Sequence, residues 1–300
     1  MTLTVRPRPF LLALAFALTV FGTARADDYV QSIETWRAGR IERLTRADGW
    51  LALIGRHPLN VGIWSVGSAP ENAIRLAAGP AHLGTITRTG DNTITFDLAD
   101  GVDATIDGTT NRSAPLHYSG DAKPTYVRAG TINFYILESA GGFFLRVRDS
   151  ESARRRNFAG IEAFPIDPAW RIEAKWVPFE TPRMIPITNV IGVTQDAPCP
   201  GKAVFTHEGR TCELLPMQDE PGDPLFFVLT DSTAGEETYE ASRFLYSDPP
   251  QDGKVILDFN KVYNPPCAFT PFTTCPLPPK ENVLPFPLRA GEKKYQGDAH

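Results

Sequence analysis

The sequence predicts a mainly β protein, built as an antiparallel sandwich or as barrel-like sheets with an N-terminal amphipathic helix. Three observations support this fold class. Apolar and polar residues alternate over many short segments after Gly49. The 27 prolines and 24 glycines are spread along the 300 residues, which indicates many turns rather than a disordered tract. Only one segment shows a clear helical period, and short strands with one helix are typical of a sandwich or barrel.

The N-terminus has the pattern of a secretory signal peptide. Arg6 and Arg8 precede an uncharged apolar run over residues 10–21, and the string A-R-A at 24–26 offers a cleavage site. The run is too short to cross a bilayer core of roughly 30 Å as a helix. No cysteine lies at the cleavage point, so we expect no lipid anchor. The sequence therefore predicts a signal peptide over residues 1–26 and a soluble periplasmic protein with no membrane anchor after cleavage.

The remaining residues, 27–300, are enough for one large domain, and we favour a single β-rich domain. Prolines interrupt the strand pattern near 179–186, which marks a possible subdomain break. Loss of three arginines with the signal peptide would change the formal net charge from −5 to −8. An acidic chain without a basic run argues against nucleic acid and anionic membrane surfaces as partners.

The predicted helix spans residues 28–46. Tyr29, Ile33, Trp36, Arg40/Ile41 and Leu44 recur at spacings of three and four, which gives one apolar stripe. Four arginines accompany the stripe at positions 37, 40, 43 and 46, and we interpret them as a solvated face.

After Gly49 the apolar period changes to two. A hairpin is predicted over residues 85–98, because the string G-D-N at 90–92 separates two alternating segments. Further strands are predicted at 102–106, 125–129, 132–137, 143–148, 171–177, 203–206, 211–215, 225–229, 255–259 and 284–288. No linker or internal repeat divides these segments.

Four cysteines occur in a chain that we expect to be exported, so disulfides are the expected state. Cys199 and Cys212 flank a predicted turn, and we predict a bridge between them. Cys267 and Cys275 would close a short proline-rich loop if bridged; the alternative is a reactive Cys267 thiolate. The five histidines are scattered and no nucleotide-binding string occurs, so we predict no metal and no cofactor.

Three strings stand out from the strand pattern. The first reads F-L-R-V-R-D at 144–149, with Arg154 following. The second contains T-D-S-T at 230–233 and R-F-L at 243–245. The third reads L-D-F-N-K-V-Y-N-P-P-C-A at 257–268 and continues with C-P-L-P-P at 275–279 and E-N at 281–282. In this order the strings resemble the bacterial proteins grouped as domain of unknown function 1684, over residues 33–292. The resemblance implies a common fold and a common surface, and it supplies no established reaction.

The residue types in these strings indicate a pocket for a small polar or anionic ligand. Arginine offers a planar donor fork that matches carboxylate or phosphate, so Arg146, Arg154 and Arg243 would hold an anionic group. The other predicted ligand-binding residues are Asp149, Tyr239, Asn260, Tyr263 and Asn264. Asp258 would orient the arginines or act as an acid or base. The alternative is that the same residues form a structural network of buried ion pairs and turns.

Two other functions stay open at this point. A hydrolase or transferase would use Cys267 as its nucleophile, with Asp258 or a distant histidine as the base. An envelope interaction module would display the prolyl segment 265–287 to a protein partner. The sequence therefore predicts a binding pocket and leaves open whether any reaction takes place in it.

Overall fold

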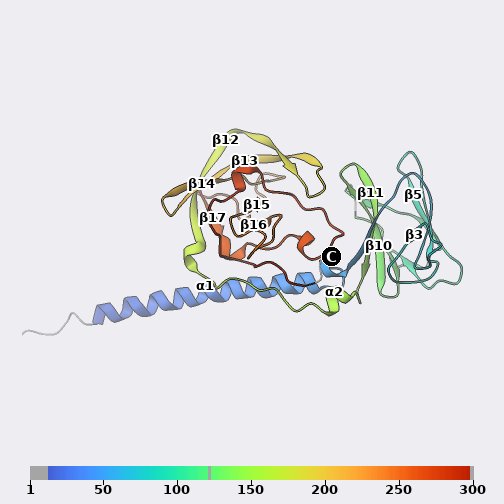
Figure 1. Cartoon of the computed structure of the whole chain (residues 1–300), viewed down its shortest axis with the longest axis horizontal. Coiled ribbons are helices and arrows are strands. Elements are labelled where there is room, and N and C mark those ends of the chain that lie inside the picture. The colour runs from blue at the N-terminus through green and yellow to red at the C-terminus, as the bar shows by residue number, and fades with distance from the viewer. Residues whose placement is uncertain (1–12, 121–122, 298–300) are drawn as a thin grey trace, which may run out of the picture.

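The structure is a computed structural model that describes residues 13–120 and 123–297. Its strands form two groups of mostly antiparallel sheets that lie side by side, with helix α1 (Ala13–Thr45) running beneath them (Figure 1). The predicted mainly β fold with an N-terminal helix is therefore confirmed. Residues 1–12 of the predicted signal peptide lie outside the described residues. Across the described ranges, no helix has an apolar stretch long enough to cross a membrane.

The first group of strands forms a six-stranded and a five-stranded sheet. The order in the six-stranded sheet is β1-β11-β10-β9-β6, with β8 also pairing β10, and the order in the five-stranded sheet is β3-β2-β4-β5-β7. The strands are β1 (Leu53–Pro58), β2 (Gly62–Gly67), β3 (Ile74–Arg75), β4 (Gly84–Arg88), β5 (Ile94–Leu98), β6 (Thr105–Ile106), β7 (Ser113–Pro115), β8 (Tyr118–Ser119), β9 (Val127–Ala129), β10 (Ile132–Ser139) and β11 (Gly142–Asp149).

An apolar core lies between these two sheets. Phe96 of β5 and Phe134 of β10 are fully buried, and their rings meet edge to face with centroids 5.3 Å apart. Alternate residues of a strand point to opposite faces of the sheet. Leu145 and Val147 of β11 are in this core, so Arg146 and Arg148 lie on the other face of the same strand. That outer face of β11 forms one wall of the site described below.

The second group is built around a four-stranded sheet with the order β14-β13-β12-β17 and a separate pair, β15-β16. Its strands are β12 (Arg171–Thr188), β13 (Thr194–His207), β14 (Arg210–Leu214), β15 (Leu225–Leu229), β16 (Arg243–Ser247) and β17 (Lys254–Asp258). The short helices are α2 (Ala153–Arg156), η1 (Trp50–Ala52), η2 (Pro168–Trp170), η3 (Phe259–Lys261), η4 (Pro266–Ala268) and η5 (Lys280–Asn282). Its own apolar core includes the fully buried Phe227, Leu245, Leu257 and Phe259.

Helix α1 packs against the second group and reaches η1 at its C-terminal end. Ile33 and Leu44 of the predicted apolar stripe are fully buried, as the spacing requires. Arg40 departs from the expectation of a solvated arginine face, because it is only 7% exposed. Its guanidinium binds groups near the far end of the chain, which the spacing within the helix does not reveal.

The predicted strand at 284–288 is wrong. Leu284, Phe286 and Leu288 alternate into the core at 2%, 4% and 0% exposure, but the segment belongs to no sheet ladder. Pro285 and Pro287 have no backbone N–H to donate, so this extended segment cannot form a regular ladder. Residues 179–186 lie inside β12, where the pairing with β13 is irregular between Pro178 and Arg183.

The predicted Cys199–Cys212 disulfide is not formed, and the strand register explains why. Cys212 of β14 lies opposite Phe205 of β13, and Cys199 is six residues farther along β13. At about 3.4 Å per residue, the two cysteines are separated by roughly 20 Å along the sheet, whereas a bridge needs Cα atoms within about 7 Å. All four cysteines are unbridged thiols in the structure.

Candidate functional site

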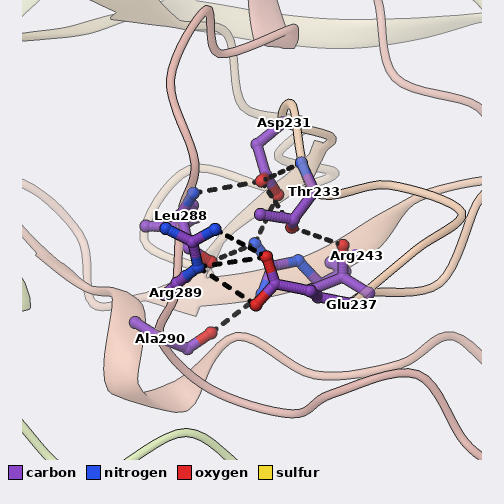
Figure 2. Close-up of polar contacts among 8 residues, drawn as sticks. Asp231, Thr233, Glu237, Arg243, Leu288, Arg289 and Ala290 are labelled. Atoms are coloured by element: carbon purple, nitrogen blue, oxygen red, sulfur yellow. Dashed lines mark hydrogen bonds and ion pairs between the residues drawn. The ribbon is translucent and has the colours of Figure 1, made fainter.

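Arg243 lies in a buried network rather than in a pocket. Its Nη2 donates to Asp231 Oδ2 at 2.5 Å and to the Leu288 carbonyl at 2.9 Å, while its Nη1 donates to the Ala290 carbonyl at 2.8 Å. The other carboxylate oxygen of Asp231 accepts from both N and Oγ1 of Thr233 and from the backbone N of Leu288 (Figure 2). The charged side chains of Arg243 and Asp231 are 1% and 0% exposed. Burial lowers the pKa of Arg243, and the adjacent Asp231 opposes that shift. We interpret this network as a structural brace that holds the C-terminal segment against β16.

Asn264 belongs to a second buried network, which ties α1 to the C-terminal segment. Arg40 Nε donates to Glu292 Oε1 at 3.2 Å, and Arg40 Nη2 donates to the Asn264 carbonyl at 2.8 Å. Glu292 Oε2 accepts from the backbone N of Asn264 at 2.7 Å. Burial raises the pKa of Glu292, and the charge of Arg40 opposes that shift. Asn264 is fully buried and therefore acts as a structural residue here.

Asp258 and Asn260 anchor the N-terminal part of α1. The Tyr29 hydroxyl donates to Asp258 Oδ1 at 2.8 Å, and Asn260 Nδ2 donates to the Tyr29 hydroxyl at 2.9 Å. Asn260 also exchanges two hydrogen bonds with the backbone of Asp167, at 2.8 and 3.1 Å. These hydrogen bonds occupy both polar atoms of the Asn260 side chain and one carboxylate oxygen of Asp258, which indicates a structural role.

The remaining predicted ligand-binding residues lie apart from one another. Asp149 accepts from the backbone N of Glu151 at 2.9 Å and shapes a turn after β11. Arg154 of α2 donates to the Leu53 carbonyl at 3.1 Å and lines a cavity of about 860 Å³ whose walls include Ile54, Ile161 and Phe272. Tyr263 lines a different cavity, described below.

Cys267, Cys275 and Tyr239 form a cluster in which both thiols are buried and the tyrosine is partly buried. The backbone N of Cys267 donates to Cys275 Sγ at 3.2 Å. Hydrogen bonds from Cys275 and Tyr239 lower the pKa of the Cys267 thiol, and the hydrogen bond with Cys267 raises that of Cys275. Cys267 is 6% exposed and lines neither of the two cavities named here. Across the described residues, no cluster of three or more His, Cys, Asp or Glu side chains is arranged to hold a metal ion.

We expect the native protein to resist alkylation by iodoacetamide at pH 8. The four cysteines are at most 7% exposed, and burial raises the pKa of Cys199 to about 11. After denaturation without reductant, Cys199 and Cys212 should both be labelled, because the register keeps them apart. Peptide mass mapping with and without reductant measures this. Rapid labelling of Cys267 in the native protein would contradict the expectation and would support a nucleophilic role for that thiol.

The cavity lined by Tyr263, which we call the basic pocket, has a volume of about 740 Å³. It lies between α1, the outer face of β11 and the β15-β16 pair. Five cationic side chains line it: Arg40, Arg43, Arg46, Arg148 and Lys261. Six aromatic side chains complete most of the wall: Trp36, Trp50, Phe226, Phe244, Tyr246 and Tyr263. Asp48 is the single carboxylate among the lining residues.

The charges of the basic pocket do not balance. Three of the five cations have a carboxylate partner: Arg40 pairs with Glu292, Arg46 with Asp48 at 2.8 Å, and Lys261 with Asp258 at 3.8 Å. Arg43 and Arg148 have no carboxylate within 4.0 Å among residues 13–120 and 123–297. The Nε atom of Arg148 is buried and has no hydrogen-bond partner within those ranges. Asp48, which pairs with Arg46, also attracts Arg148 electrostatically. The five cations of the pocket nevertheless outnumber their three carboxylate partners by two.

The cationic character continues behind the aromatic wall. Arg146 is 7% exposed, and its guanidinium carbon lies 4.9 Å from the centre of the Trp50 ring. Its only hydrogen bond to a described residue is a long one, from Nη1 to the Tyr135 hydroxyl at 3.4 Å. Arg56 lies directly opposite Arg146 across the β1-β11 pairing. The positive potential of Arg146 adds to that of Arg148, two residues away on the same face of β11.

Comparison with known proteins places the second half of the chain in a family. Residues 156–293 match the family model described as "Protein of unknown function (DUF1684)". The chain belongs to this family. No curated protein matches the sequence. A solution NMR structure of an uncharacterized protein, from gene locus rrnAC0354 of Haloarcula marismortui, is 30% identical over 46% of this chain and 78% of that chain, with a TM-score of 0.40.

The DUF1684 region supplies only part of the basic pocket. Phe226, Tyr246 and Lys261 lie within the matched residues, whereas Arg43 and Arg148 lie before them. The two arginines without a carboxylate within 4.0 Å thus come from α1 and β11, whereas four of the six aromatic side chains come from the DUF1684 region. Sequence reasoning selected Tyr263 for the site but missed Arg43, Arg148, Trp50 and Tyr246. The run of arginines on the helix was a usable signal for Arg43, while nothing local marked Tyr246.

Proposed function

We propose that this chain is an exported protein that binds a small anionic ligand in the basic pocket. The observation that carries the proposal is the pair of uncompensated arginines, Arg43 and Arg148, in a cavity of about 740 Å³. Cavities of this size accommodate small organic ligands. A buried guanidinium nitrogen without a partner costs free energy unless a ligand satisfies it, which favours an anion at Arg148.

Export is supported by the sequence of the N-terminus, where a basic region, an apolar run and a small-residue cleavage string follow one another. The chain carries a net negative charge, whereas the lining of the basic pocket carries a net positive charge. Because the surrounding surface repels anions on average, the basic pocket would attract them selectively.

Binding of inorganic phosphate and of citrate tests the proposal. Trp36 and Trp50 line the pocket, so tryptophan fluorescence should change as either anion is added. We expect Arg148→Ala to weaken binding by at least about tenfold, because a charge-assisted hydrogen bond contributes roughly 1.5–3 kcal/mol. The double variant Arg43→Ala/Arg148→Ala should lose detectable binding.

The matched control is Arg75→Ala, which removes an exposed arginine on β3 in the first group of sheets. It changes the net charge by the same amount and should leave binding unchanged. Raising the salt concentration should weaken binding to the wild type, since exposed Arg43 is screened by ions. Equal binding by the wild type and the double variant would refute the proposal, as would a wild type that binds neither of these anions nor an organic phosphate.

A further inference from the structure

We propose that the ligand of the basic pocket is a phosphate monoester carried on a planar aromatic ring. This inference rests on the proposed function and adds the chemical class of the ligand. It is drawn from three properties of the pocket, namely its uncompensated charge, its exposed ring faces and its volume.

The charge points to a dianion. Arg43 and Arg148 leave two positive charges without carboxylate partners among the described residues, whereas the other three cations are each paired. A phosphate monoester carries a charge of about −1.5 to −2 at pH 7 and three strong acceptor oxygens. A monocarboxylate would neutralise only one of the two arginines. Guanidinium groups match phosphate oxygens particularly well, since two N–H groups can bind two oxygens at once.

The rings point to an aromatic moiety. Tyr246 is 52% exposed and stacks on Phe226 with ring centroids 4.7 Å apart and planes 20° apart. One face of the Tyr246 ring is thus covered by Phe226, and the residue is too exposed for its other face to be buried by protein. The guanidinium of Arg146 packs over one face of the Trp50 ring and holds the ring in place. Flat ligands stack on such supported rings with little loss of side-chain entropy.

The volume argues against a bare anion. A cavity of about 740 Å³ is many times larger than a phosphate ion. A phosphate alone would therefore leave the aromatic side chains of the pocket exposed to water. A ring attached to the phosphate would cover apolar surface while the phosphate reaches the arginines. The combined contacts explain why the same cavity contains six aromatic and five cationic side chains.

Isothermal titration calorimetry with three probes tests the inference: phenyl phosphate, cyclohexyl phosphate and inorganic phosphate. All three present phosphate to Arg43 and Arg148, and only phenyl phosphate adds a planar ring. We expect phenyl phosphate to bind at least threefold tighter than cyclohexyl phosphate and at least tenfold tighter than inorganic phosphate. Tyr246→Leu keeps an apolar side chain but removes the ring, so it should abolish the preference for phenyl over cyclohexyl phosphate. Because Tyr246 is half exposed, this variant should fold as the wild type does, and its thermal unfolding measures this.

The outcomes separate the two proposals. Equal binding of phenyl and cyclohexyl phosphate in the wild type, unchanged in Tyr246→Leu, would overturn the aromatic phosphate while leaving the anion site in place. Binding of citrate without binding of phenyl phosphate would do the same. Failure of every one of these anions to bind would overturn both proposals together.

Discussion

Asp231→Ala is expected to lower the free energy of unfolding by about 3–5 kcal/mol, the range for breaking a buried ion pair by removing one partner. The substitution leaves the fully buried guanidinium of Arg243 without its counter-charge and removes the acceptor for the backbone N of Leu288. Urea denaturation followed by circular dichroism measures the change. A loss of this size would show that Arg243, whose contacts Figure 2 draws, stabilises the fold. A role of Arg243 in ligand binding predicts no such loss.

Glu237→Ala is the matched control for this experiment. Glu237 pairs with Arg289 at 2.8 Å beside the same network, but the pair is exposed to solvent. Removing an exposed pair should not change stability measurably. If Asp231→Ala unfolds at the same urea concentration as Glu237→Ala, the brace is refuted. If Asp231→Ala cannot be purified, Asp231→Asn retains one acceptor oxygen, and it should unfold at a lower urea concentration than the wild type.

Glu292→Ala is expected to destabilise the fold by a similar amount, about 3–5 kcal/mol. The carboxylate accepts from Arg40 Nε and from the backbone N of Asn264, and all three residues are buried. Its removal would leave a buried arginine uncompensated on α1 and would detach the helix from the C-terminal segment. Chemical denaturation and limited proteolysis of α1 provide the two measurements.

Glu162→Ala provides the comparison, because Glu162 binds Lys293, the neighbour of Glu292, in an exposed pair at 3.3 Å. This variant should unfold as the wild type does and should keep α1 resistant to proteolysis. An undiminished stability of Glu292→Ala would show that the Arg40 guanidinium finds other acceptors, such as the Asn264 carbonyl that it already contacts.

The parts of the fold that the sequence predicted are those decided by neighbouring residues. The hairpin of β4 and β5 was predicted because a turn string joins two alternating segments, and the structure confirms it. The segment 284–288 alternates in the same way, yet it is not a strand, because a ladder depends on a partner far away in sequence. Pro285 and Pro287, which cannot donate a backbone hydrogen bond, are the local signal against a strand at this position.

The candidate site was harder to predict for the same reason. Arginines, tyrosines and asparagines in the three strings suggested a ligand, but residue type alone does not distinguish a buried brace from a pocket wall. Arg243 and Asn264 proved to be braced by Asp231 and Glu292, which lie 12 and 28 residues away in the sequence. Arg148 was part of a noted string, but its lack of a carboxylate within 4.0 Å among the described residues is a property of the folded chain.

Helix α1 also constrains the order in which the chain can reach its final state. Tyr29 binds Asp258 and Asn260, and Arg40 binds Glu292, so its anchors lie 229 to 252 residues downstream. Helix α1 can therefore dock only when these downstream segments are in place. Loops of that length close late, since their closure entropy must be overcome before the contacts form. Until residues 258–292 have folded, α1 lacks this docking surface, and the basic pocket, which has α1 as one wall, cannot form.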